Sequence, residues 1–187
     1  AVESIRSADA CLCILEATRS LLKDDLKLLD GIMTTGKPVC LAINKWDLRQ
    51  KGVTLDWIRR AILKRAPFLH FAPAISTSAK TGYNVINSLE KVTEVAQTSR
   101  RKVTVGQARK LLELFTQTRG APVAVRNATF IRLWQVGVVP PTFNLLVRVR
   151  RSFRDSDLAY FEKVIRAEIG FEGTPIRIHL LEKRRSG

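Results

Sequence analysis

The sequence predicts two structural modules, an α/β module in residues 1–98 and a smaller α+β module in residues 99–187. Three observations predict this division. Short apolar runs alternate with helical patterns in the first half, the order of elements changes in the second half, and the surplus positive charge is concentrated there. The chain has 187 residues, a formal net charge of +15 and 45% hydrophobic residues, a balance typical of a globular protein.

The first module is predicted to be a parallel sheet covered by helices. Compact apolar runs at 10–15, 39–43 and 74–76 have the length of buried strands. Each run is followed by a helical pattern, and the alternating order favours a parallel sheet. In the first helix Leu26, Leu29 and Met33 recur at helical spacing, and Gly36 ends it. In the second, Leu55, Ile58 and Ile62 recur in the same way after the N-cap Thr54. The third helix is expected at 85–97.

The second module is predicted to have the order α-β-β-α-β, a small sheet backed by two helices. Thr104 and Gln107 have the spacing of a capping box ahead of the first helix. The expected strands are 129–136, 143–149 and 176–181, and the second helix is 156–169. In the middle strand Phe143, Leu145, Val147 and Val149 are expected to face one way. Trp134 is expected in the core, as are the phenylalanines.

A four-residue motif follows the second apolar run: Asn44-Lys45-Trp46-Asp47. Ligands bind at the carboxyl ends of strands in such sheets, and Asn-Lys-x-Asp at this place is the guanine-recognition box of regulatory GTPases. The Asp47 carboxylate offers two acceptors to the N1–H and N2–H₂ donors of guanine, which adenine lacks. Asn44 can bridge base and protein, and the Lys45 stem can lie along the purine.

A second motif, Ser78-Ala79-Lys80, follows the third apolar run, 31 residues beyond Asp47. It occupies the place of the Ser-Ala-Lys box of the same GTPases. By that likeness the backbone N–H of Ala79 faces guanine O6, Ser78 braces the Asp47 carboxylate, and Lys80 covers the base opposite Lys45. The first box alone resembles an ordinary solvated turn, but the two boxes in this order, each directly after its own strand, predict a guanine site.

The phosphate-binding half of a GTPase is missing from the sequence. No Gly-x-x-x-x-Gly-Lys-Ser/Thr loop occurs, and no Asp-x-x-Gly precedes the first apolar run. Without them there is no cradle for phosphates and no hydroxyl for Mg²⁺. We therefore expect the second half of a GTPase domain, with no catalytic residue and no metal site in this chain and no GTP hydrolysis by it alone.

Residues 1–98 resemble the latter part of a GTPase domain of the Era/Der class, and residues 99–187 resemble the C-terminal KH-like domain of the Der (EngA) family. The first resemblance is carried by Ser7-Ala8-Asp9-Ala10, Leu15-Glu16-Ala17-Thr18 and Asn44-Lys45-Trp46-Asp47-Leu48. The second is carried by Arg100-Arg101, Pro140-Pro141-Thr142-Phe143, Tyr160-Phe161 and Gly173-Thr174-Pro175-Ile176-Arg177. Departures are Glu16, where most such GTPases have Asp, and the weakly basic stretch 122–127.

The resemblance implies a partial P-loop GTPase domain followed by a KH-like domain. It implies a parent protein that binds GTP and GDP, hydrolyses GTP with Mg²⁺ and assists assembly of the large ribosomal subunit. Its partners would be the large subunit or its ribosomal RNA, and the missing N-terminal GTPase domains of the same protein. Two alternatives stay open: a non-catalytic module that docks RNA or a partner domain, and an Era-type GTPase with a single GTPase domain and a KH domain.

The basic second half suggests where a nucleic acid would bind. If Ile176, Ile178 and Leu180 face inward, alternating residues of the last two strands face outward. The expected RNA or domain-interface face contains Arg148, Arg150, Arg151, Arg177 and His179. The segment 170–173 fits the Gly-x-x-Gly pattern of KH domains, but it joins a helix to a strand instead of two helices, so we interpret it as a helix cap and turn.

The remaining sequence features concern location. Cys11, Cys13 and Cys40 are expected to be buried small hydrophobes, which suits a reducing compartment such as the cytoplasm. No apolar run approaches the roughly 18 residues that a membrane span needs, so we expect no membrane partner.

Overall fold

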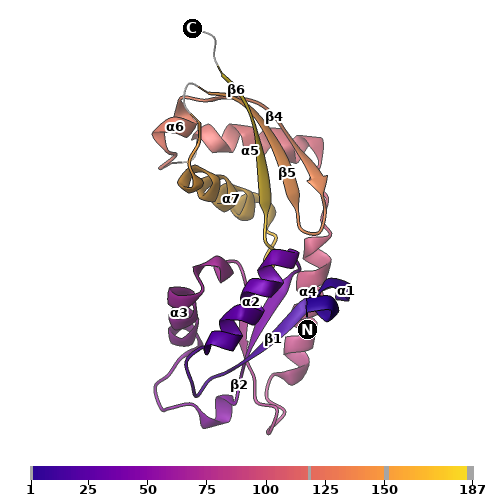
Figure 1. Ribbon diagram of the computed structural model, residues 1–187, viewed down its shortest axis with the longest axis vertical. Coiled ribbons are helices and arrows are strands. Elements are labelled where there is room, and N and C mark those ends of the chain that lie inside the picture. The colour runs from indigo at the N-terminus through magenta and orange to yellow at the C-terminus, as the bar shows by residue number, and fades with distance from the viewer. Residues whose placement is uncertain (1, 118, 150–151, 185–187) are drawn as a thin grey trace. The chain divides into compact units, whose positions relative to one another are not determined.

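The structure, a computed structural model, describes residues 2–117, 119–149 and 152–184 (Figure 1). The chain forms two compact units. The first contains Ala1–Ser99 and also the short segment Glu172–Pro175, and the second contains Arg100–Phe171 and Ile176–Gly187.

The first unit is built on a parallel sheet with the strand order β1-β2-β3. The strands are β1 (Cys11–Glu16), β2 (Val39–Asn44) and β3 (Ala74–Ser76). The helices are α1 (Val2–Ser7), α2 (Lys23–Thr35), α3 (Leu55–Arg65) and α4 (Val85–Ser99), with 3₁₀ turns η1 (Trp46–Leu48) and η2 (Pro67–Leu69). The predicted α/β class is confirmed; helix α1 and the two 3₁₀ turns were not predicted.

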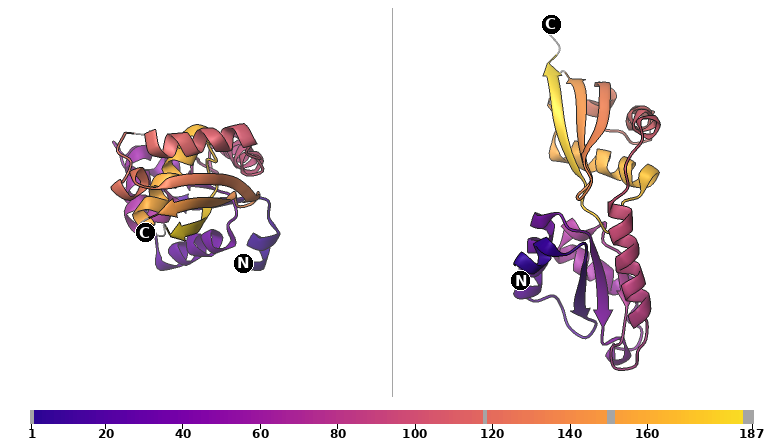
Figure 2. Two further views of the ribbon diagram at one scale, coloured as in Figure 1. Left: turned by 90° about the horizontal axis from the view of Figure 1, so that it is seen from above. Right: turned by 90° about the vertical axis from the view of Figure 1, so that its right-hand side faces the viewer.

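Helices cover both faces of this sheet, with α2 and α4 on opposite sides in the right-hand view of Figure 2. The central strand β2 is buried from Val39 to Ile43 because it has a neighbour on each edge and helices above and below. Local signals act as the sequence predicts: Gly36 ends α2 in the left-handed conformation, and the Thr54 hydroxyl accepts a hydrogen bond from Trp57 N at the start of α3.

The segment Glu172–Pro175 is part of the first unit although it lies far along the chain. Val39 N donates to Gly173 O at 2.7 Å, and Gly173 N donates to Phe71 O at 2.9 Å. Lys91 pairs with Glu172 at 2.7 Å, and this hydrogen bond raises the pKa of Lys91. The sequence assigns the whole of 99–187 to one module, whereas the structure gives these four residues and Ser99 to the other.

The second unit is a three-stranded sheet in which β5 lies between β4 and β6. Its elements are α5 (Val105–Gln117), α6 (Val123–Arg126), β4 (Thr129–Gly137), β5 (Thr142–Val149), α7 (Asp155–Ile169) and β6 (Arg177–Arg184). Strands β4 and β5 are antiparallel, and β5 and β6 are parallel. The predicted α+β order is confirmed, with the one-turn helix α6 as an addition.

One apolar core joins the sheet of the second unit to α5 and α7. Leu111 and Phe115 of α5 pack with Phe161 of α7 and with Phe143 and Leu145 of β5, all fully buried. The capping box forms as predicted: Gln107 N donates to the Thr104 hydroxyl and Thr104 N donates to Gln107 Oε1. Trp134 is not a core residue, contrary to our expectation.

Candidate functional site

The Asn44–Asp47 motif lies where the sequence places it, at the carboxyl end of β2. The loop that follows β3 holds it there, because Trp46 N donates to Thr77 O at 3.0 Å and Thr77 N donates to Ile43 O at 2.9 Å. Lys45 has φ 60, a left-handed conformation that costs a non-glycine residue about 1–2 kcal/mol. Such local strain is typical of functional turns.

Asp47 and Ser78 are in direct contact. The Ser78 hydroxyl donates to Asp47 Oδ1 at 2.6 Å, and the same hydroxyl oxygen accepts a hydrogen bond from Thr81 N at 3.3 Å. Ser78 is 1% exposed, so its side chain is fixed, whereas Asp47 is exposed. The hydrogen bond from Ser78 lowers the pKa of Asp47, and the charge of Lys80 acts in the same direction. The result is an oriented, ionised carboxylate that faces solvent.

Asn44 and Ala79 are also brought together, by a hydrogen bond from Ala79 N to Asn44 Oδ1 at 3.0 Å. The resemblance predicts that this N–H faces guanine O6. In the structure it donates to the Asn44 side chain instead, because that amide oxygen lies within reach of the turn. A bound base would have to share this donor with Asn44 or displace it.

Lys45 takes part in an ion pair that the sequence analysis missed. Its ammonium lies 2.9 Å from Glu16 Oε1, and this hydrogen bond lowers the pKa of Glu16. Glu16 also pairs with Arg19 at 3.4 Å, and Arg19 pairs with Asp25 at 2.7 Å. The signal was present in the strand pattern: Glu16 and Asn44 end adjacent parallel strands in register, so Lys45 is the next residue along. Lys80 is exposed on the other motif.

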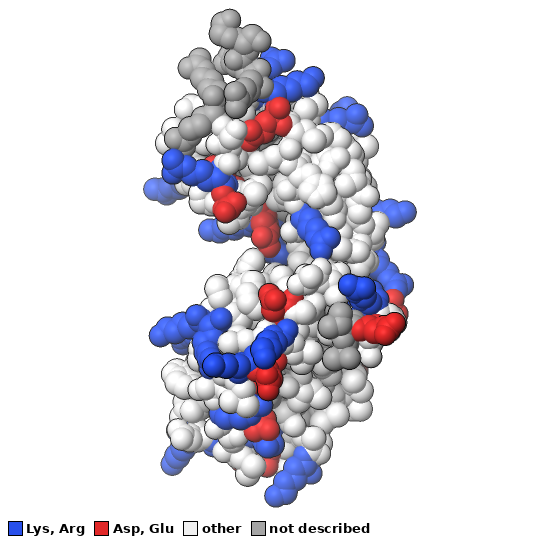
Figure 3. Space-filling view, viewed as in Figure 1, with Lys and Arg blue, Asp and Glu red and all other residues white. Residues whose placement is uncertain are grey.

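The described part of the predicted basic face lies on the second unit. Arg148, Arg177 and His179 are exposed on the same side of the sheet. Arg177 is in register with Thr142 and Arg148 with Lys183, so the two arginines lie six residues apart along the strands, about 20 Å. Arg150 and Arg151 lie outside the described residues. Figure 3 shows Lys and Arg side chains spread over the second unit in this view, not gathered in one patch.

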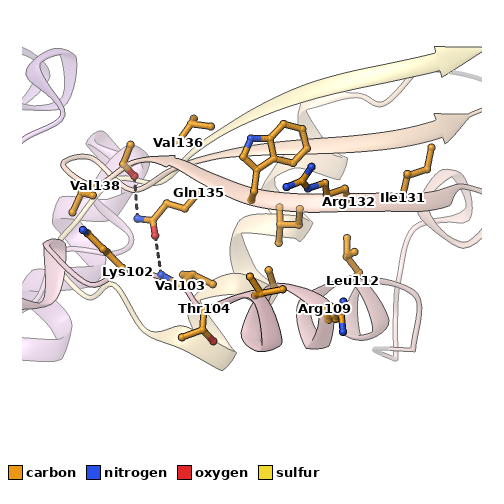
Figure 4. Close-up of a pocket in the computed structure, with 15 residues that line it drawn as sticks. Lys102, Val103, Thr104, Arg109, Leu112, Ile131, Arg132, Gln135, Val136 and Val138 are labelled. Carbon is orange, nitrogen blue, oxygen red and sulfur yellow. Dashed lines mark hydrogen bonds between the residues drawn. The ribbon is translucent and has the colours of Figure 1, made fainter.

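A cleft of about 620 Å³ lies between the start of α5 and β4 (Figure 4). Gln135 closes one end: it accepts a hydrogen bond from Val103 N at 2.8 Å and donates to Gly137 O at 3.0 Å. The cationic residues at the cleft are Lys102, Arg109 and Arg132, and the Arg132 guanidinium lies over the Trp134 ring. The sequence analysis missed this cleft, because it depends on how the chain before α5 meets an edge strand.

Two further observations concern the described residues only. No group of three or more His, Cys, Asp or Glu side chains among them could hold a metal ion. None of the helices they form is both long and apolar enough to cross a membrane.

Comparison with known proteins shows which proteins this chain is similar to. Residues 102–180 match the family described as the KH-domain-like region of EngA bacterial GTPase enzymes, C-terminal. The GTPase Der of Rippkaea orientalis is 34% identical over 95% of this chain, and that of Synechocystis is also 34% identical over 95%. The resemblance to the Der family is confirmed. The GTPase Der of Caldanaerobacter subterraneus is 32% identical over the same share.

The chain spans only about 40% of the length of these Der relatives. Among solved structures, Era in complex with MgGDPNP and part of 16S ribosomal RNA matches 98% of this chain and 68% of its own, with 18% identity and a TM-score of 0.40. Translation elongation factor SelB from Methanococcus maripaludis matches 55% of this chain and 23% of its own, with 17% identity and a TM-score of 0.42.

Proposed function

We propose that this chain supplies the guanine-recognising part of a GTP-binding and GTP-hydrolysing ribosome-assembly factor, together with a KH-like domain that docks on RNA. The observation that carries the proposal is the contact between the two motifs. Two loops that follow different strands meet through the Ser78–Asp47 and Ala79–Asn44 hydrogen bonds. The similarity to Der GTPases supports a guanine nucleotide, GTP or GDP, as the ligand.

Base recognition follows from the chemistry of these side chains. The Asp47 carboxylate accepts from the N1–H and N2–H₂ donors of guanine, and its lowered pKa keeps it in the accepting form. Adenine offers no such donor pair, so the same carboxylate disfavours it. Ser78 holds the carboxylate in place, Lys45 and Lys80 flank the base with their stems, and Asn44 anchors the turn of Ala79. The guanine-binding residues that we propose are Asn44, Lys45, Asp47, Ser78, Ala79 and Lys80.

The chemical step belongs to the whole protein in this proposal. When bound, Mg²⁺ would neutralise charge at the phosphates, and the phosphate loop that this sequence lacks would come from a segment outside it. We propose the large ribosomal subunit or its RNA as the partner and the cytoplasm as the location.

Calorimetric titration of the chain with GDP and with ADP tests the guanine site. We expect weak binding of GDP and weaker binding of ADP, because the site contacts the base but has no cradle for the phosphates. Asp47→Ala should abolish the preference, while Asp56→Ala, which removes an exposed carboxylate from α3, should leave it unchanged. Equal affinity for the two nucleotides would contradict the guanine site. Tight binding of GDP would contradict the view that the chain contains only part of a nucleotide site.

A docking module without catalysis is the second candidate, and the charge distribution favours it: +11 of the net charge lies in residues 99–187. The Era-type arrangement is less favoured, because the Gly-x-x-Gly segment joins α7 to β6 and its Glu172 is paired with Lys91. Upstream sequence with two phosphate loops would support the Der arrangement, and one loop would support the Era arrangement.

A further inference from the structure

One face of the second-unit sheet has no helix packed on it among the described residues. In β5, Phe143, Leu145, Val147 and Val149 are buried, and the helices α5 and α7 pack on that side. The intervening residues of β5 therefore point to the opposite face. The strand register extends this alternation to both neighbours and arranges the outward residues in rows across three strands.

Two rows in the middle of this face carry aromatic, imidazole and aliphatic side chains. Their members, in strand order, are Trp134, Asn144 and His179 in one row and Arg132, Leu146 and Leu181 in the next. The Arg132 guanidinium carbon lies 5.1 Å from the centroid of the Trp134 ring. Leu181, in register with the half-buried Leu146, is 41% exposed. A half-buried indole and a guanidinium on an open sheet are groups on which unpaired bases stack.

Cations lie in the rows on either side of the middle pair. Arg148 and Lys183 are in register with each other at one end, and Arg177 lies at the other. No ion pair between described residues involves Arg132, Arg148 or Lys183. Successive rows are about 7 Å apart, since each step is two residues along a strand.

Carboxylates are absent from the described outward positions of the three strands. The nearest acidic residue of β6, Glu182, is in register with the inward residue Val147 and accepts a hydrogen bond from Phe153 N at 3.0 Å. The face thus combines stacking groups in its middle with cations at its ends, and its described outward residues include no carboxylate that would repel phosphate. Such a combination is complementary to a single strand, whose bases and phosphates are both accessible.

We infer that this face binds single-stranded RNA, with unpaired bases stacked on Trp134 and Arg132 and the flanking phosphates held by Arg148, Lys183 and Arg177. We call these five residues the stacking face. The inference rests on the proposed RNA role of the KH-like domain. It adds which surface of that domain binds the RNA, and that the RNA is single-stranded. A duplex would present its phosphates but hide its base faces, so it would not use Trp134.

Fluorescence anisotropy with the full chain tests the inference, using a labelled RNA of about 12 nucleotides, single-stranded or annealed to its complement. We expect tighter binding of the single strand. Trp134→Ala should weaken that binding about 5- to 150-fold, the range expected for loss of base stacking, and Trp134→Phe should restore most of it. Trp57→Ala, which removes an exposed indole from α3, is the matched control and should change nothing.

The charge contribution is measured by the salt dependence of binding. Arg148→Ala combined with Lys183→Ala should reduce the slope of log K against log salt by about 1 to 2, as expected when two phosphate contacts are lost. Lys163→Ala, an exposed cation of α7, should leave the slope unchanged. Leu181→Glu should not destabilise the fold, because the Leu181 side chain is exposed. It should weaken binding of the single strand, because the new carboxylate repels the phosphates.

The outcomes separate the inference from the proposed function. Equal affinity for both RNA forms, with no effect of Trp134→Ala or Leu181→Glu, would overturn the stacking face while leaving RNA docking in place. Binding of neither RNA form would overturn the proposed RNA role as well, and would leave a protein domain as the partner of this surface.

Discussion

At the scale of single residues, the candidate guanine site depends on one hydroxyl. Ser78 is almost fully buried, and its Oγ both donates to Asp47 and accepts from Thr81 N. The bond fixes the position of an exposed carboxylate that would otherwise sample several rotamers. In the proposed site, recognition of the base would therefore depend on Ser78 through the Asp47 carboxylate that it holds.

Replacing Ser78 by Ala should raise the pKa of Asp47, because its largest stabilising hydrogen bond is lost. Asp47 has a lowered pKa in the folded chain, so its ionised form adds to the free energy of unfolding at neutral pH. This contribution is lost as the pH falls through the folded-state pKa. In Ser78→Ala this contribution should be smaller, and its loss should be complete at a higher pH. NMR titration of the Asp47 carboxyl carbon measures the shift.

The matched control is Ser88→Ala, which removes another buried hydroxyl, one that donates to Val85 O in α4. The pKa of Asp47 should not move in that variant. An unchanged pKa in Ser78→Ala itself would show that the hydrogen bond does not exist in solution.

At the scale of elements, the turn between α7 and β6 is the least expected part of the fold. Its Gly173 has φ +72°, and a Cβ there would clash with Val95 Cγ1. Two constraints thus coincide at one residue: a left-handed backbone and close approach to a buried side chain of α4. The turn therefore packs as part of the first unit, a role that its Gly-x-x-Gly pattern does not indicate.

Gly173→Ala should destabilise the first unit by about 2–4 kcal/mol, combining the left-handed penalty with overpacking against Val95. Gly52→Ala is the control: Gly52 has φ +86 but nothing within 4 Å of the added Cβ, so only the backbone penalty of about 1–2 kcal/mol remains. Urea unfolding measures both. Equal destabilisation by the two substitutions would contradict the close packing of the turn.

At the scale of the whole molecule, the net charge of +15 has an energetic consequence. Like charges on a folded surface repel one another, and salt screens that repulsion beyond about 10 Å at 0.1 M. Opposing this, the structure has exposed ion pairs such as Lys110–Glu168 and Arg60–Asp56, each of which contributes little. Repulsion should therefore dominate the response to salt.

We expect the melting temperature to rise by about 2–4 °C between low and physiological salt, the shift that about 1 kcal/mol produces in a chain of this size. Lys163→Glu lowers the surplus by two charges on an exposed part of α7 and should reduce the rise. Differential scanning calorimetry in NaCl makes the comparison. A melting temperature that falls with salt would show that ion pairs outweigh repulsion.

Much of the fold follows from local patterns. Apolar runs locate β1, β2 and β3, Gly36 and Thr54 mark helix ends, and the capping box precedes α5. Helix α1, the turns η1 and η2 and helix α6 escaped prediction because they are only 3 to 6 residues long. Segments of one turn have no apolar period to detect, and their stability comes from tertiary contacts.

Local sequence is enough to predict the order of the elements, the two boxes that follow strands, and the surplus charge of the second half. Which of these groups meet depends on the folded chain. It pairs Lys45 with Glu16, gives the N–H of Ala79 to Asn44 and places Gly173 in the first unit.

The face that Trp134 occupies was decided in the same way. The register shift between Phe130 and Arg132 puts Arg132 and Trp134 in register with outward residues of β5, whereas simple alternation from Thr129 would turn both inward. The physical reason is common to all these cases. Propensity and periodicity act over a few residues, while register, bulges and long-range hydrogen bonds depend on neighbours that only the folded chain supplies.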